Sequence, residues 1–182
     1  MRWTAICAGA AAAATPLAFG AVVDEAPTST IGGNLTSISN PHGVAVDSSG
    51  RMYLANQGGV VNVYQWANSG NVARTAGVPN PAGTNTPLGV FVNSDDHVWV
   101  AYNSGHVAEF GPNPGNGATP LRVIDAREAG AYNSIRGVVV DRDGYIYTAD
   151  CDSGIIKVFA PDAVGAATPV RDLRGPVTRL GP

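Results

Sequence analysis

The sequence predicts an all-β fold, and three observations carry that prediction. One pattern occurs three times, at residues 41–56, 86–102 and 134–150. Each copy continues into two more short apolar runs, so that four strands fit in a repeat of 46 to 48 residues, the spacing of Gly43, Gly89 and Gly137. The 23 Gly and 13 Pro are spread along 182 residues, as in short strands joined by tight turns. Four-stranded antiparallel repeats of this length are typical of the blades of a β-propeller.

The first 20 residues have the layout of a secretory signal. Arg2 precedes an Ala-rich apolar run, and the small residues Ala18 and Gly20 precede Ala21. We therefore expect residues 1–20 to be a signal peptide and the protein to be secreted or otherwise extracytoplasmic. The alternative is an Ala-rich helix at the start of a cytoplasmic protein. The stretch is too short and too weakly apolar to predict a membrane span.

Residues 21–40 form a lead-in to the first copy of the pattern. Ile31 lies 12 residues before Gly43, much as Ile124 lies 13 residues before Gly137. The lead-in is therefore expected to add an extra outer strand ahead of three full blades. We place the blades at residues 41–76, 86–125 and 134–174, and the start of a further blade at 175–182.

The first strand of each copy is a short apolar run without polar alternation. Such a run predicts an innermost strand that is covered on both faces. Each run begins with a glycine, which suits a place where several backbones crowd together. The predicted strands span residues 43–46, 89–92 and 137–140.

A four-residue turn follows each first strand. Its first residue can accept a hydrogen bond from the backbone two residues on, so these side chains are predicted to cap turns rather than to bind ligands. Asp96 takes the last place, where the other copies have glycine, because Asp tolerates a left-handed conformation better than most residues. The capping residues are Asp47, Asn93 and Asp141.

The second strand has an aromatic residue at one fixed place, Tyr53, Trp99 or Tyr147. Period-two patterning puts the three rings on one face of each sheet, where we expect them to pack in the core against the next sheet. The second strands are predicted at residues 52–55, 98–101 and 146–149, and the third strands at 60–64, 106–110 and 155–159.

The fourth strands are predicted at residues 72–75, 121–124 and 170–173. An outermost strand tolerates charge, so Arg74, Arg122 and Arg171 are expected at its solvent edge. Glu109 stands in the third strand where the other copies have valine, which predicts a more solvated second blade.

Composition argues against several classes of partner. The formal net charge of −3 gives no excess of Lys and Arg for nucleic acid or for an anionic membrane surface. Two cysteines are too few for a disulfide framework, and Cys151 is interpreted as a passive residue because no Cys-x-x-Cys or paired His lies near it. The sequence has no Gly-x-Ser-x-Gly or His-Glu-x-x-His motif, and we expect no cofactor.

At these residues the chain resembles the NHL repeat family. The pattern Pro-x-Gly-Val-Ala-Val-Asp-x-x-Gly-x-x-Tyr-x-Ala-Asn/Asp, with a later apolar run ending in Phe or Tyr, is matched by residues 41–64 and 137–159. The middle copy departs from it with Asn93, Asp96 and Tyr102. The resemblance extends from about residue 28 onward and implies a propeller, most commonly of six blades.

Three blades do not close a ring, because each blade exposes two apolar faces. The sequence favours a fragment of a longer propeller, since residues 173–182 resemble the approach to another copy. The alternative is a homodimer that completes a six-bladed ring, although two such chains would bring a surplus outer strand to each junction. An unstable, aggregating product is a third possibility.

His42 is the weak metal candidate among the histidines. The three histidines occupy different places in the repeat, whereas a metal site in a propeller channel needs equivalent positions that converge. The Pro-His-Gly stretch resembles the blade motif of propeller lyases, the amidating lyase and streptogramin lyase among them, which implies an alternative function as a lyase or hydrolase. The ligands besides His42 would then come from other blades.

Polar residues that directly follow the second strands are the best candidates for binding. They end equivalent strands, so we expect them to gather on one rim of the ring, although they could also serve only to end strands. The sequence favours a non-enzymatic scaffold that binds a protein, peptide or glycan at this rim. The candidate rim residues are His42, Asn56, Gln57, Tyr102, Asn103, Asp150 and Cys151.

Overall fold

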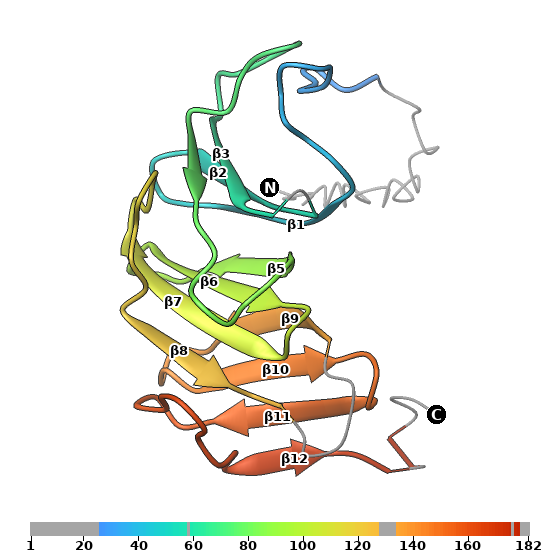
Figure 1. Ribbon diagram of the computed structural model, residues 1–182, viewed down its shortest axis with the longest axis vertical. Coiled ribbons are helices and arrows are strands. Elements are labelled where there is room, and N and C mark those ends of the chain that lie inside the picture. The colour runs from blue at the N-terminus through green and yellow to red at the C-terminus, as the bar shows by residue number, and fades with distance from the viewer. Residues whose placement is uncertain (1–25, 58, 128–133, 176, 179–182) are drawn as a thin grey trace, which may run out of the picture.

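A computed structural model describes residues 26–57, 59–127, 134–175 and 177–178. These residues form three four-stranded sheets, each antiparallel and each ordered along the sequence, without a helix among them. Figure 1 shows the three sheets following one another in an arc. The predicted signal peptide, residues 1–20, lies outside the described residues, as does much of 175–182.

Each sheet is one blade and runs from an innermost to an outermost strand. The first blade contains β1 (Pro41–Val46), β2 (Arg51–Asn56), β3 (Val61–Gln65) and β4 (Ala76–Val78). The second contains β5 (Pro87–Val92), β6 (His97–Tyr102), β7 (His106–Pro112) and β8 (Arg122–Asp125). The third contains β9 (Ile135–Val140), β10 (Ile146–Asp150), β11 (Ile155–Phe159) and β12 (Arg171–Leu173).

Two apolar cores join the blades. Tyr53 of the first blade packs in one core with Val98 and Phe110 of the second. Trp99 of the second blade packs in the other core with residues of the third, Ile146 and Phe159 among them. The prediction that these aromatic rings cover the next sheet is therefore confirmed for Tyr53 and Trp99, whose side chains are 0% and 2% exposed.

The outer faces of the first and third blades differ from the prediction. Among the innermost strands only β5 is covered on both faces, whereas Val44 of β1 is 63% exposed and Val139 of β9 is 51% exposed. Tyr147 is only half-buried, so its assignment to the core was wrong. The cause is the same in each case, because no sheet of the described residues packs on these two faces.

The turns form as predicted. Asp47 Oδ1 accepts a hydrogen bond from the backbone of Ser49 at 2.9 Å, and the corresponding bonds recur in the other two blades at 3.1 and 3.0 Å. Asp96 has a φ of 61°, the left-handed conformation for which glycine is used elsewhere. The Asp96 carboxylate also accepts hydrogen bonds from the backbone and hydroxyl of Ser48, at 2.8 Å for the backbone bond, and so ties the first blade to the second.

This double role predicts an ordered pair of variants. Asp96→Gly loses the hydrogen bonds to Ser48 but relieves the strain of a positive φ. We therefore expect the free energy of unfolding to fall by about 0.5–1 kcal/mol. Asp96→Ala loses the same bonds and keeps an unfavourable φ, which adds about 1 kcal/mol. Urea denaturation of both variants checks the order. If the Ala variant is as stable as the Gly variant, the backbone at residue 96 changes conformation when the aspartate is lost.

The fourth strand of the first blade lies later than predicted. β4 pairs Val78 with Val61 and Ala76 with Val63, so residues 72–75 precede the strand. The reason lies in the next blade, whose Asn116 side chain accepts a hydrogen bond from Gly77 N at 2.9 Å. Nor does Arg74 point to the solvent edge: it is half-buried and donates to Asn62 Oδ1 at 2.7 Å.

Glu109 does not mark a solvated blade, because it is buried with 8% exposure. Its carboxylate pairs with His97 Nδ1 at 2.7 Å and with Arg122 Nε at 2.5 Å. Arg122 in turn lies 5.0 Å from the ring centroid of Trp99 and donates to Ala163 O at 3.1 Å. The expectation of Arg122 at the solvent edge was therefore wrong, since this cluster clamps the second blade to the third.

The lead-in contributes a single bridge rather than a regular strand. Ile31 pairs in parallel with Gly70, in the same way that Ile124 pairs with Gly165 between the second and third blades. The alignment of Ile31 with Ile124 thus holds in space, and the fold has three four-stranded blades with an extra outer segment ahead of them.

Candidate binding rim

One edge of the arc brings together the starts of the innermost strands and the ends of the second strands. The strand pairs that define it are Pro41 with Asn56, Pro87 with Tyr102 and Ile135 with Asp150. All seven residues predicted for the rim lie at or directly beside these pairs. They divide into a buried group and an exposed group.

Asn56 belongs to the buried group, with 2% exposure. Its side chain accepts a hydrogen bond from Ser39 N at 2.6 Å and donates to Ser37 O at 3.1 Å. Asn62, which the sequence analysis did not single out, donates to the same Ser37 carbonyl at 2.9 Å. Asn56 therefore anchors the lead-in to the first blade and is not open to a ligand.

Asp150 is 4% exposed and organises the loop that follows β10. Its Oδ1 accepts hydrogen bonds from the backbone of Ser134 at 3.3 Å, of Asp152 at 2.9 Å and of Ser153 at 3.4 Å. Its Oδ2 has no hydrogen-bond partner within the described part of the chain. All three hydrogen bonds that the Asp150 carboxylate accepts therefore come from backbone N–H groups and hold the local structure.

Tyr102 is fully buried, in the core between the first and second blades. Burial raises the pKa of its hydroxyl far above the usual range, so the group stays neutral. Within the described residues the hydroxyl has no partner. Tyr102 is therefore a core residue, which the sequence pattern did not distinguish from a rim residue.

The exposed group presents different chemistry in each blade. Gln57 accepts a hydrogen bond from the Asn40 side chain, and Asn103 Oδ1 accepts one from Ser134 Oγ at 2.6 Å. Cys151 Sγ accepts one from Arg136 Nε at 2.8 Å, so the rim gains an arginine that the sequence analysis did not select. These side chains, with His42, are the exposed ones at the rim: His42, Gln57, Asn103, Arg136 and Cys151.

His42 is exposed at the start of β1, at the repeat position held by Leu88 and Arg136 in the other blades. Its side chain makes no hydrogen bond to another described residue. The described residues hold no group of three or more His, Cys, Asp or Glu side chains placed to share a metal ion.

Solved structures with a similar arrangement identify the fold. The chain superposes on Raptor from Chaetomium thermophilum with a TM-score of 0.54 and 14% identity, covering 74% of this chain and 12% of that one. The WD40 domain of Toxoplasma gondii coronin superposes with a TM-score of 0.56 and 11% identity, covering 74% of this chain and 34% of that one. The WD40 β-propeller domain of Doa1 superposes with a TM-score of 0.53 and 11% identity, covering 72% of this chain and 38% of that one. The fold is that of a β-propeller.

The β-propeller likeness concerns the fold alone, because the identities are so low. The chain spans well under half the length of each of these solved structures. No protein-family model matches the sequence, and no curated protein matches it. Among the described residues, no helix is long and apolar enough to cross a membrane.

Proposed function

We propose that this propeller is a non-enzymatic binding scaffold of NHL-like repeats, exported from the cell, which presents its rim to a protein, peptide or glycan. The observation that carries the proposal is the chemical variety of the exposed rim. The turn-capping Asp or Asn and the aromatic residue of the second strand recur in every blade, whereas Gln57, Asn103 and Cys151 stand at one repeat position, are exposed and differ in every blade. Loops held by a rigid scaffold are where binding residues are usually found.

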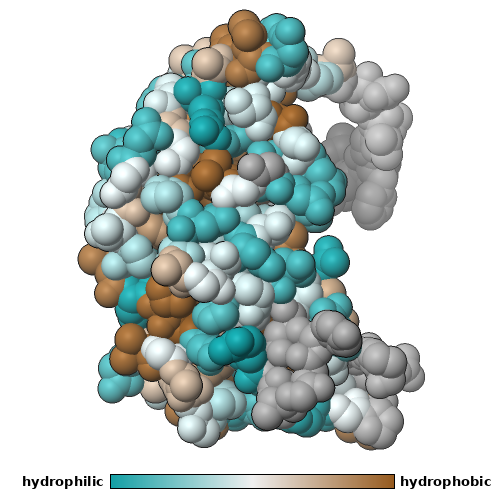
Figure 2. All heavy atoms as spheres, viewed as in Figure 1, coloured by the Kyte–Doolittle hydropathy of each residue, from teal (hydrophilic) through white to brown (hydrophobic). Residues whose placement is uncertain are grey.

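The surface around the rim is compatible with a polar ligand. Figure 2 shows hydrophilic and hydrophobic residues intermixed on the face in view, with hydrophobic groups at the first-blade end and along the outer edge beside β8. Leu121 and Val164, next to β8, are 61% and 62% exposed. The alternative function, a lyase or hydrolase, would need metal ligands from other blades beside His42, because the described residues hold no group of three or more His, Cys, Asp or Glu side chains placed to share a metal ion.

Three exposed rim residues can be changed together to test the proposal. The variant His42→Ala, Gln57→Ala, Cys151→Ser is expected to fold with each change costing no more than about 0.5 kcal/mol. Immobilised wild-type protein and variant are compared for the proteins, peptides and glycans that each retains. We expect at least one specific ligand of the wild type to be lost from the variant.

The control changes exposed residues at the opposite edge of the blades. Ser49, Ser94 and Arg142 lie in the turns between first and second strands, so their replacement by alanine leaves the rim unchanged. A ligand retained by this control but not by the rim variant locates binding at the rim. Equal retention by all three proteins would contradict the proposed function.

A further inference from the structure

The open face of the first blade carries an apolar groove of about 310 Å³. Its walls come from β1, β2 and β3, from the loop after β3, and from Ser29, Ile31 and Ile38 of the lead-in. Val44, Met52 and Tyr64 are among the residues that line it.

The same surface exists on the second and third blades, where it is filled. On the third blade, Val138, Ile146 and Phe159 pack in one core around Trp99 of the second blade. On the second blade, Val90, Val98 and Phe110 surround Tyr53 of the first. The residues at the same repeat positions in the first blade are Val44, Met52 and Tyr64. The groove is therefore a socket built to receive an aromatic side chain from a neighbouring blade.

The third blade carries a matching aromatic side chain that enters no socket. Tyr147 holds the repeat position of Tyr53 and Trp99 and is half-exposed on the open face of the blade. Val139, its cross-strand partner on β9, is exposed by 51%.

The lead-in already supplies the outermost strand of a blade on the groove. Gly32 N donates to Gly70 O at 3.1 Å and Gly70 N donates to Thr30 O at 2.6 Å. Between the second and third blades, Asp125 N donates to Gly165 O at 2.7 Å and Gly165 N donates to Val123 O at 2.8 Å. Residues 30–32 thus occupy the place that β8 occupies at the next junction.

The far edge of residues 30–32 carries no strand within the described part of the chain. In β8 this edge pairs with β7, through Ile124 and Val107. The residue that corresponds to Val107 in the third blade is Ile156, which now pairs with Leu173 of β12. β12 has three residues, and all three are exposed.

We propose that a second copy of this chain docks its third blade on the groove and inserts Tyr147 between Val44, Met52 and Tyr64. In this dimer, Ile31 of one copy and Leu173 of the other would need the same place beside Gly70. Residues 30–32 of the first copy therefore replace β12 of the second copy and pair with its β11. The same junction forms twice, which closes a ring of six blades. This proposal uses blade faces and not the rim, so it is independent of the proposed binding function.

Single substitutions on the two faces test the docking in the full chain. Val44→Glu places a charge in the socket and Val139→Glu places one beside Tyr147, and both side chains start from exposed positions. Burying either unpaired charge should weaken self-association on the order of a hundredfold. We expect the wild type to sediment as a dimer and each variant as a monomer at the same concentration.

A mixture of the two variants supplies the decisive result. The Val139→Glu chain has an intact socket and the Val44→Glu chain has an intact third-blade face, so one junction forms and the mixture yields a heterodimer. This recovery also shows that both variants are folded. Leu121→Glu, at a site 61% exposed and outside both faces, should remain a dimer. A monomeric wild type, or variants that still dimerise alone, would overturn the proposal.

A cross-link tests the exchange of strands. In a Cys151→Ser background, Ile31→Cys with Ile156→Cys should form a disulfide between two copies on oxidation, because these positions become cross-strand neighbours. Leu173→Cys with Ile156→Cys should form little disulfide within one copy once β12 has been displaced. Efficient intrachain cross-linking of the second pair in a dimer, without the first, would overturn the exchange.

Discussion

Replacing Gly89 with alanine is expected to lower the free energy of unfolding by about 3 kcal/mol or more. The new Cβ would lie 2.6 Å from the carbonyl oxygen of Arg136 and 3.2 Å from its carbon, and both are backbone atoms of the next blade. Neither a rotamer change nor a small shift of a flexible side chain relieves such a contact. The innermost strands β5 and β9 would have to separate.

The other two copies provide graded controls. In Gly43→Ala the added Cβ would lie 3.1 Å from Leu88 O, so we expect the free energy of unfolding to fall by about 1–2 kcal/mol. At Gly137 the nearest atom is Ala149 Cβ at 3.6 Å, an ordinary contact. Gly137→Ala should therefore change stability by no more than about 0.5 kcal/mol, with a small gain from the restricted unfolded chain.

Urea denaturation of the three variants, at concentrations where the chain is monomeric, measures this order. Equal losses at all three positions would show that glycine is needed for the strand itself and not for the approach of the next blade. If the six-bladed ring forms, Gly137 becomes a close-approach position like Gly89. Gly137→Ala should then weaken the dimer while the monomer stays as stable as the wild type.

The elements that the repeat predicted well are those whose cause lies within one copy. The first three strands and their turns depend on local apolar patterning and on a capping Asp or Asn, which a single repeat contains. β4 depends on more, because its register is set with Asn116 of the following blade, and the strand accordingly begins after the predicted range.

Burial of the rim residues could not be predicted for a similar reason. Asn56 is buried only because residues 37–39 fold back onto it, and Glu109 only because His97 and Arg122 meet its carboxylate. Tyr147 stays half-exposed because no described sheet covers it. For Asn56 and Tyr147 the outcome depends on segments outside their own repeat. Glu109, His97 and Arg122 lie in one repeat, but the pairing of their side chains is not revealed by its apolar pattern.

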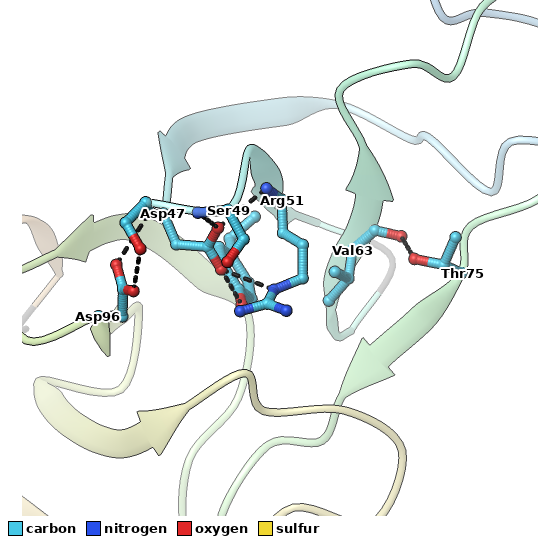
Figure 3. A network of polar contacts seen from close by, with 8 residues as sticks. Asp47, Ser49, Arg51, Val63, Thr75 and Asp96 are labelled. Atoms are coloured by element: carbon cyan, nitrogen blue, oxygen red, sulfur yellow. Dashed lines mark hydrogen bonds and ion pairs between the residues drawn. The ribbon is translucent and has the colours of Figure 1, made fainter.

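Asp47→Ala is expected to lower the free energy of unfolding by about 3–5 kcal/mol, because it leaves a buried hydroxyl, two partly buried backbone N–H groups and a half-buried guanidinium without their acceptor. The Asp47 side chain is 0% exposed and accepts four hydrogen bonds (Figure 3). Oδ1 accepts from the backbone of Ser49 and Arg51 at 2.9 and 3.0 Å, and Oδ2 accepts from Arg51 Nε at 2.7 Å and Tyr53 Oη at 3.0 Å. Burial raises the pKa of Tyr53 to about 12, so its hydroxyl remains a donor.

Asp141 is the matched control in the third blade. Its Oδ1 accepts from the backbone of Asp143 and Tyr145 at 3.0 and 2.9 Å, and its Oδ2 accepts from Tyr147 Oη at 2.9 Å. The turn is the same, but Asp141 is exposed and has no arginine on Oδ2. Asp141→Ala should therefore cost about 1 kcal/mol. Thermal denaturation of both variants compares them, and similar losses would mean that burial and Arg51 add nothing to the turn.

The ion pair at Asp47 also predicts how stability depends on pH. Desolvation alone would raise the pKa of Asp47, but hydrogen bonds from Arg51, Tyr53 and Ser49 outweigh it and lower the pKa below its usual value. A carboxyl group whose pKa is lower in the folded state stabilises the protein above its unfolded pKa of about 4, and this contribution is lost as the pH falls through the folded pKa.

Asp47→Asn isolates this contribution because it removes the charge with little change in shape. Wild type and variant share their other titrating groups, including Asp125, whose pKa Arg127 lowers to about 2. The difference in their free energies of unfolding should be largest near neutral pH and shrink steadily below about pH 4. A difference that stays constant from neutral to acid pH would mean that Asp47 contributes through its hydrogen bonds and not through its charge.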